Sequence, residues 1–360
     1  MKTNTLFFMS AMAASLFFNS VQAQQKEGQA DFSRKSTKNL EIVAQFNDVR
    51  PGNVTVSHNG RVFATMHPLS GPKQQLVEII NGKAIPFPSS DVQKSGQPSE
   101  NKFDTPLGII TDKKNRVWMI DMGLDLGKTR LWCFDLKKNK IAEKIDLPDD
   151  IAPKGSFIQD VAIDEKNGWA YLADIANPGI IALNLKTKKI RRFSGHPALQ
   201  SEDLDMIIDG KVIDFGGKPA RVGINPITLS DDRETLFFGS MNGTSWYEVP
   251  ARLFRENKDD ESIGNSIKKF GDKPVSDGAA TDRHDNHYIT DLGGHGISKL
   301  DKNGKLTEFI RDPKLQWADN VAISDDGYLY ISVNQLHTTT AFSGKPDAGK
   351  PPYFIYKVKL

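Results

Sequence analysis

Short apolar segments alternate with polar turns along almost the whole chain, and one unit of this pattern recurs six times. Each unit has a five-residue apolar segment, a turn rich in Asp, Asn and Gly, and a second apolar segment. Such a unit predicts two antiparallel strands joined by a tight turn. The six first segments are Asn53–Ser57, Gly108–Asp112, Asp160–Asp164, Pro226–Ser230, Gly278–Asp282 and Asn320–Ser324.

The spacing of these units predicts the fold. Their first residues lie 42 to 66 residues apart, which is typical of propeller blades. The second segments are Arg61–Met66, Val117–Asp121, Ala170–Asp174, Thr235–Gly239, His287–Asp291 and Tyr328–Val333. The intervals leave room for two further strands per unit. We therefore predict an all-β chain that folds as a six-bladed β-propeller without long helices.

The two ends of the apolar pattern are predicted to complete one blade. Tyr353–Leu360 alternates between apolar and polar residues, as a strand does, and Leu40–Phe46 can add a further strand beside it. Pairing of the two chain ends would close the ring of blades and leave few open sheet edges.

The first residues predict an export signal. Lys2 precedes an apolar stretch from Leu6 to Phe18, too short to span a bilayer, and Val21-Gln22-Ala23 is a small-x-small cleavage signal. We predict a signal peptide at 1–23, a polar leader at 24–38 and the propeller at 39–360. The mature protein is then secreted or periplasmic.

Charge and cysteine content limit the choice of partners. The 47 Lys and Arg residues nearly balance the 45 Asp and Glu residues, so there is no electrostatic reason to expect nucleic acid or a membrane surface. We expect a small-molecule ligand or substrate and a monomer. Cys133 is the only cysteine, which excludes an intramolecular disulfide, and its apolar neighbours predict a buried structural thiol.

Candidate site residues follow from the geometry of a propeller. The first strand of each blade lines the central channel, so polar residues at the strand starts should converge at one mouth. We expect Asp160 and Asp277 to act in acid–base catalysis. The alternative is that these polar residues at the strand starts cap strand ends or hold ordered water in the channel. Ligand-contacting candidates in this ring are Asn53, Gln159, Asp319 and Asn320.

Three residues outside that ring are also candidates. His295 lies between glycines in Gly293–Gly296, where the backbone can approach a ligand and an imidazole can act as an acid or base. His337 is a possible counterpart at the rim, and Trp317 is a candidate for stacking on a ligand. A second, outer ring is predicted at the ends of the partner strands: His67, Asp121, Asp174, Asn242, Asp291 and Asn334.

Several segments resemble the major royal jelly protein and yellow family, in its bacterial branch. They are Thr105–Ile109 with Val117–Gly123, Gly223–Ser230 with Phe238–Thr244 and Val249–Leu253, and Asp312–Trp317 with Asn334–His337 and Pro351–Tyr353. The resemblance implies a secreted six-bladed propeller with a small-molecule site at the channel mouth. Members include nutritive proteins, binders of biogenic amines and insect proteins credited with dopachrome conversion. This chain lacks the cysteine pairs of the insect pattern.

A more distant likeness is to gluconolactonase and regucalcin-like propellers. These hold a divalent metal with an acidic residue and amides at the starts of innermost strands, and the matching positions here are Asn225 and Asp277. Oxygen ligands of this kind suit Ca²⁺ or Mg²⁺ as the cofactor. The chain departs from that pattern at Asn53, where the relatives have a glutamate ligand.

Three functions remain open. The first is a small-molecule-binding propeller that acts as a tautomerase or isomerase of the dopachrome-converting type. The second is a metal-dependent lactonase, in which the cation polarises the carbonyl and Asp160 or Asp319 activates water. The third is a ligand- or protein-binding propeller without chemistry.

Overall fold

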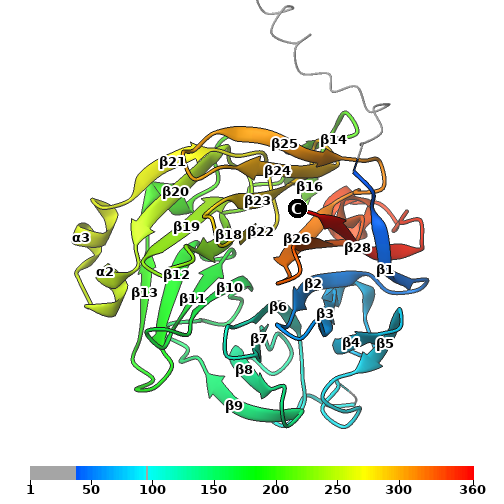
Figure 1. Ribbon diagram of the computed structural model, residues 1–360, viewed down its shortest axis with the longest axis horizontal. Helices are drawn as coiled ribbons and strands as arrows, with labels where there is room; N and C mark the ends of the chain where they lie inside the picture. The colour runs from blue at the N-terminus through cyan, green and yellow to red at the C-terminus, as the bar shows by residue number, and fades with distance from the viewer. Residues whose placement is uncertain (1–37, 95) are drawn as a thin grey trace, which may run out of the picture. The chain divides into compact units, whose positions relative to one another are not determined.

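The computed structural model describes residues 38–360 except residue 95. Six four-stranded antiparallel sheets surround a common centre as blades, which confirms the predicted six-bladed β-propeller (Figure 1). The predicted signal peptide and nearly all of the polar leader lie outside the described residues.

From the innermost strand outward, the first three blades are β2 (Pro51–Val56), β3 (Val62–Met66), β4 (Leu76–Ile80) and β5 (Lys83–Pro86); β6 (Pro106–Thr111), β7 (Arg116–Asp121), β8 (Arg130–Asp135) and β9 (Lys140–Asp146); and β10 (Ile158–Asp164), β11 (Trp169–Asp174), β12 (Gly179–Asn184) and β13 (Ile190–Ser194).

The other three blades follow the same plan. They are β18 (Ile224–Leu229), β19 (Thr235–Ser240), β20 (Ser245–Pro250) and β21 (Lys268–Asp272); β22 (Ala279–Thr281), β23 (His287–Asp291), β24 (Gly296–Leu300) and β25 (Leu306–Arg311); and β26 (Ala318–Ile323), β27 (Tyr328–Val333), β28 (Tyr353–Lys359) and β1 (Glu41–Phe46).

The last blade contains both ends of the described chain. Strand β1 pairs antiparallel with β28, with Ala44 opposite Ile355 and Phe46 opposite Tyr353, as the apolar pattern predicts. This pairing brings β26 beside β2, and the backbone N–H of Val54 donates to Asn320 Oδ1 at 3.2 Å across the junction.

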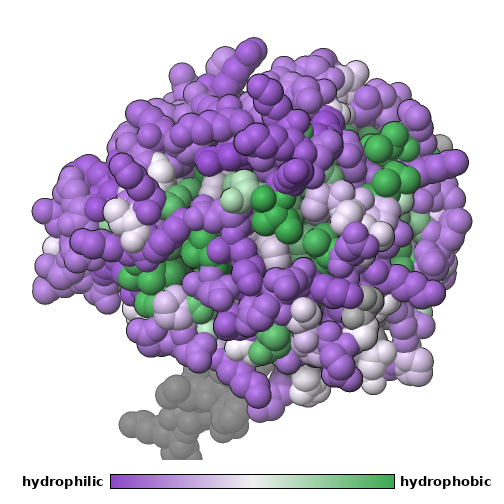
Figure 2. Space-filling view, turned by 90° about the horizontal axis from the view of Figure 1, so that it is seen from below, coloured by the Kyte–Doolittle hydropathy of each residue, from purple (hydrophilic) through white to green (hydrophobic). Residues whose placement is uncertain are grey.

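The core lies between neighbouring blades. One of its clusters joins Leu107, Trp118 and Leu131 of the second blade to Leu172 and Ile181 of the third. Inner strands such as β2 and β10 are buried along their whole length, whereas the outer strands β5 and β9 carry many exposed residues. Accordingly, the face seen in Figure 2 is mostly hydrophilic with small hydrophobic groups between. Cys133 is buried in the core, and burial raises the pKa of its thiol to about 12.

An insertion between the third and fourth blades covers one end of the propeller. It contains two hairpins, β14 (Ile207–Ile208) with β15 (Lys211–Val212) and β16 (Asp214–Phe215) with β17 (Lys218–Pro219). Met206, Ile208 and Ile213 pack against Trp317 and Leu336, at the end where the inner strands begin. Residues 201–222 are called the cap below.

Helices in the described part of the chain are short. They are η1 (Pro68–Ser70), η2 (Pro197–Leu199), α2 (Arg252–Arg255), α3 (Asp260–Gly264), η3 (Leu336–Thr338) and α4 (Thr340–Ser343). None of these helices is long and apolar enough to cross a membrane.

Glycines let inner strands of adjacent blades approach closely. A Cβ atom on Gly108 would lie 2.4 Å from the carbonyl oxygen of Gln159, and one on Gly278 would lie 2.6 Å from that of Asp319. Both obstacles are backbone atoms of the next blade. The inner ring therefore has this diameter only because these positions have no side chain.

We expect Gly108→Ala to lower the free energy of unfolding by about 1 to 3 kcal/mol, because the added methyl group forces two blades apart. Chemical denaturation would measure the loss. Gly264→Ala is the matched control: its Cβ would meet only the His196 ring at 3.2 Å, in a helix where alanine is preferred. Equal stability of Gly108→Ala and the wild type would contradict the close-approach argument.

Candidate functional site

The polar residues at the starts of the inner strands come together, but they are not at an open mouth. Asn225 is fully buried, and Asp277 and Asp319 are 2% and 1% exposed. The cap packs over Trp317 at this end. The sequence placed these residues at a channel mouth, and the cap, which no inner-strand pattern reveals, accounts for the difference.

Asp277 is held by three N–H donors. Its Oδ1 accepts hydrogen bonds from Gln159 Nε2 at 2.5 Å and Asn225 Nδ2 at 2.8 Å. Its Oδ2 accepts one from the Trp317 indole at 2.7 Å. Trp317 is thus fully buried as a hydrogen-bond donor to the ring. Burial, followed by the charge of Asp319, raises the pKa of Asp277 well above its usual value.

Asp319 and Asp160 complete a group of three buried carboxyls. Asp319 accepts a short hydrogen bond from Asn334 Nδ2 on Oδ2, whereas its Oδ1 has no partner among the described residues. Asp160 accepts from the backbone N–H groups of Val161 at 3.0 Å and Ile227 at 3.1 Å. Burial raises the pKa of Asp160 and of Asp319 to about 7. Both carboxyls therefore change protonation near neutral pH.

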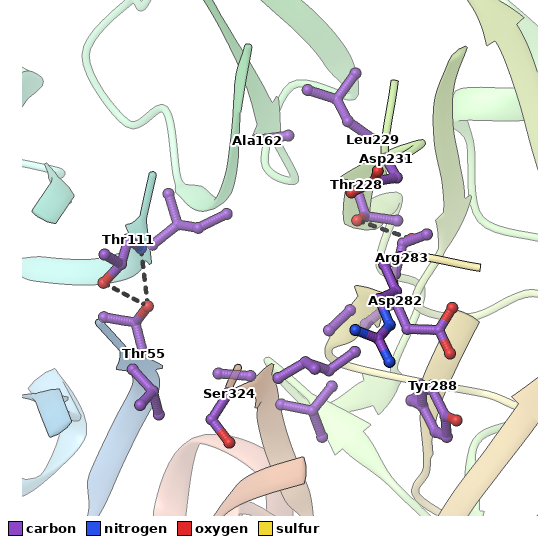
Figure 3. Close-up of a pocket in the computed structure, with 18 of the residues that line it drawn as sticks. Thr55, Thr111, Ala162, Thr228, Leu229, Asp231, Asp282, Arg283, Tyr288 and Ser324 are labelled. Carbon is purple, nitrogen blue, oxygen red and sulfur yellow. Dashed lines mark hydrogen bonds between the residues drawn. The ribbon is translucent and has the colours of Figure 1, made fainter. Parts of the chain in front are cut away.

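A cavity of about 800 Å³ fills the central channel and ends at Asp160 and Asn320. It reaches the surface at the opposite end from the cap, where exposed His58, Lys113 and Arg283 line it. Figure 3 shows the middle of this channel, with Thr55 and Thr111 on one side and Thr228 facing them across the space. Of the residues expected in the ring, Asp160 and Asn320 line the cavity.

The inner strands repeat with a pseudo-two-fold pattern, so that blades one to three correspond to blades four to six. The corresponding segments are Pro51–Ser57 and Ile224–Ser230, Pro106–Asp112 and Ser276–Asp282, and Ile158–Asp164 and Ala318–Ser324. Contacts repeat as well. Thr55 Oγ donates to Thr111 Oγ at 3.0 Å, and Thr228 Oγ lies 3.1 Å from Thr281 Oγ.

Asp160 and Asn320 are equivalent under this pattern. Each side chain accepts the backbone N–H of the fourth residue of the next inner strand, from Ile227 at 3.1 Å or from Val54 at 3.2 Å. An asparagine therefore accepts this N–H in one half of the molecule, so this contact does not by itself require a carboxylate at Asp160. The second contact of Asp160, from the Val161 N–H at 3.0 Å, is not repeated at Asn320 among the described residues.

The two candidate histidines lie under the cap and outside the cavity lining. His295 Nε2 is 2.7 Å from Asp209 Oδ1, and His337 Nε2 is 4.0 Å from Asp209 Oδ2. His337 also stacks on Trp317, with ring centroids 6.2 Å apart. Burial lowers the pKa of His337 to about 4, so it is neutral at pH 7. His337 thus connects the cap to Trp317, and His295 contacts the cap through Asp209.

Asn53 is buried in the ring but makes its contact through the backbone. Its N–H donates to Thr65 Oγ at 3.1 Å, and its Oδ1 has no partner among the described residues. Asn225 Oδ1 is likewise without a partner there. Such oxygens accept hydrogen bonds from ordered water or ligate a cation.

The arrangement around Asp277 does not fit the metal cage that the gluconolactonase likeness implies. Three N–H donors, one of them an indole that cannot present an oxygen, already occupy the carboxylate. Asn225 turns its nitrogen toward Asp277, so its oxygen does not share a ligand position with that carboxylate.

Sequence reasoning did not identify the four threonines of the channel wall or the cap. Aligning the first three inner strands with the last three would have revealed the threonines, because they recur at the same positions in both halves. The 66-residue interval between the third and fourth units, the longest in the chain, was the available sign of an insertion.

Solved structures share the fold. A gluconolactonase from Xanthomonas campestris superposes with a TM-score of 0.56 at 12% identity, covering 91% of each chain. A luciferin-regenerating enzyme gives 0.56 at 11% identity, covering 90% of this chain and 95% of its own. Virginiamycin B lyase from Staphylococcus aureus gives 0.52 at 16% identity, covering 89% of this chain and 100% of its own. At such identities the likeness concerns the fold alone.

Sequence comparison goes further. Major royal jelly protein 9 of Apis mellifera is 23% identical over 218 residues, 56% of this chain and 50% of the relative. Major royal jelly protein 3 of Apis mellifera is 22% identical over 266 residues, 68% and 48% of the two chains. This chain thus spans about half the length of these curated relatives. The profile of the family described as "Major royal jelly protein" matches residues 105–357, well over half of the sequence. The chain belongs to the major royal jelly protein family.

Proposed function

We propose that this protein is a small-molecule tautomerase or isomerase that works in the central channel, with Asp160 as the group that transfers the proton. The observation that carries the proposal is the position of Asp160. It lies at the inner end of the cavity, where its symmetry-related counterpart is an asparagine. The dopachrome-converting proteins of the same family supply the reaction class as an analogy.

The chemistry requires only groups that the chain contains. With its pKa raised to about 7, Asp160 is near the optimum for a general acid or base at neutral pH. Its carboxylate removes a proton from one atom of a conjugated substrate, and the released electron pair moves through the ring toward a carbonyl oxygen. The protonated carboxyl then returns the proton to a second atom. Substrate and product have the same composition.

Asn320 can stabilise the oxygen that gains charge. Its Oδ1 accepts from Val54, and its Nδ2 has no acceptor among the described residues while the side chain lines the cavity. An amide N–H directed at a developing oxyanion lowers the barrier of such a reaction. Asp277, Asp319, Gln159 and Trp317 lie outside the cavity lining, and we propose that they set the electrostatic environment of Asp160. Export as a secreted or periplasmic monomer, based on the N-terminal pattern, is part of the same proposal.

We expect Asp160→Asn to reduce turnover by about 100-fold or more while the protein stays folded, because a general base contributes roughly that factor. The assay would follow the absorbance of an aminochrome such as dopachrome. Asn320→Asp is the matched variant, because it makes the reverse exchange of Asp and Asn at the equivalent position in the other half of the propeller. A wild-type rate in folded Asp160→Asn would exclude the proposed role.

A chelator test separates this proposal from the lactonase alternative. Since N–H donors occupy Asp277, we expect chelator, Ca²⁺ and Mg²⁺ each to leave the melting temperature unchanged. A cation that binds only the folded state must raise it by mass action. A rise with Ca²⁺ or Mg²⁺ that Asp277→Asn abolishes would instead support a metal site and a lactonase.

Buried carboxyls also predict a direction for the pH dependence of stability. The folded pKa of Asp160 and of Asp319, about 7, is above the usual value of 3.8, so the folded state binds more protons between these values. Stability should therefore fall as pH rises from about 4 through 7. Urea unfolding at pH 5 and pH 8 would measure this. The Asp160→Asn, Asp319→Asn double variant should show a clearly smaller difference, and an unchanged difference would refute the assignment.

A further inference from the structure

The wall of the channel has polar and apolar sides in alternation. Thr55 with Thr111 forms one polar side, and Thr228 with Thr281 forms the opposite one. Between them the third and sixth blades present the corresponding Ala162–Ile163 and Ala322–Ile323. Figure 3 shows Ala162 between the two threonine sides. This alternation matches the chemistry of a flat ring, which has apolar faces for the alanines and polar edges for the hydroxyl groups.

The first threonine pair offers the channel a donor. Thr55 donates its only hydroxyl hydrogen to Thr111 Oγ at 3.0 Å and accepts from the Thr111 N–H at 2.8 Å. The hydroxyl hydrogen of Thr111 has no acceptor among the described residues. The residue opposite Thr111 on the next strand is Val117, whose side chain cannot accept a hydrogen bond. This hydrogen is therefore available to a ligand.

His287 gives the second pair the opposite polarity. It occupies the position equivalent to Val117, opposite Thr281, and its Nδ1 lies 2.8 Å from Thr281 Oγ. Burial lowers the pKa of His287 to about 4, so the ring is neutral and one nitrogen accepts.

The surroundings of His287 select its tautomer. Nε2 has no hydrogen-bond partner among the described residues. The imidazole is enclosed by the rings of Phe237, Phe270 and Trp246, with centroids at 4.4, 5.4 and 5.8 Å. An N–H surrounded by aromatic rings can interact favourably with their π-electrons, whereas a lone pair cannot. We assign the hydrogen to Nε2 on this ground, and Nδ1 then accepts from Thr281.

The donors then run in one direction, from Thr228 to Thr281 to His287. Thr281 donates to His287, so it accepts from Thr228 Oγ, and Thr228 presents only lone pairs to the channel. The Thr55–Thr111 side of the channel therefore offers a hydrogen-bond donor, and the Thr228–Thr281 side offers an acceptor. This difference arises from a single exchange between the two halves, His287 for Val117.

We propose that the channel recognises a planar ring that carries a carbonyl group on one edge and an N–H or O–H group on the opposite edge. Thr111 donates to the carbonyl, and Thr228 accepts from the N–H or O–H. His287 is a positioning residue, which fixes the direction of the Thr228–Thr281 hydroxyl pair. The inference rests on the proposed function, because it names the substrate class of the same channel.

Two probes of nearly equal shape test the inference. 4-Pyridone has a carbonyl opposite an N–H group, and 4-pyranone has a ring oxygen in place of that N–H. We expect the full-length protein to bind 4-pyridone about tenfold more tightly than 4-pyranone, as measured by ligand-observed NMR or calorimetry. Equal affinities, or no binding of 4-pyridone, would overturn the proposal.

Four variants separate the roles, with thermal unfolding as the control for folding. Thr228→Val should abolish the preference for 4-pyridone, whereas Thr111→Val should weaken both probes and keep the preference. His287→Leu removes the acceptor that orients Thr281 and should also abolish the preference, an effect that a purely structural role would not produce. Retention of the preference in either Thr228→Val or His287→Leu would refute the relay. Asp160→Asn should leave the preference for 4-pyridone intact. The tautomerase proposal is tested separately, because it fails if this variant turns over dopachrome at the wild-type rate.

Discussion

Closure of the ring by β1 and β28 is the constraint on which the remaining structure depends. Without this pair, β26 would not lie beside β2, and the hydrogen bond from Val54 to Asn320 would be lost. A closed ring fixes how near the inner strands come to one another, and Gly108 and Gly278 meet that requirement by having no side chain. The channel, its carboxyl groups and its threonine pairs are all held at positions that closure determines. Stability and site geometry are consequently not independent in this molecule.

Three buried carboxyl groups, Asp160 at the inner end of the channel and Asp277 and Asp319 beyond its lining, are costly for the folded state. No lysine or arginine pairs with Asp160, Asp277 or Asp319 in residues 38–360, residue 95 aside, and amide, indole and backbone N–H groups provide their hydrogen bonds instead. Neutral donors compensate a buried charge only in part, which is why burial raises the pKa of each. Groups that oppose folding near neutral pH are characteristic of functional sites.

The fold could be predicted from sequence because its information is local. Alternating residues and Asp/Asn/Gly turns specify each strand pair, and the spacing of the pairs specifies the blades. The candidate site was predictable only in part. The starts of inner strands must converge, which brought Asp160, Asn225, Asp277 and Asp319 together. Whether that end is open depends on how the cap packs, with Met206 and Ile213 against Trp317, and strands of two residues leave no periodic pattern to detect.

The pseudo-two-fold arrangement distinguishes structural from chemical requirements within one chain. Where both halves keep the same residue, as with Gly108 and Gly278 or Thr55 and Thr228, the shared geometry of the blades explains the residue. Where the halves differ at equivalent positions, the fold is satisfied by either residue and the difference needs another cause. Asp160 against Asn320 places a titratable group on one side of the channel. His287 against Val117 gives the two threonine pairs opposite polarity. Both departures act on the same cavity, and together they turn a symmetric scaffold into a channel that can orient an asymmetric ligand.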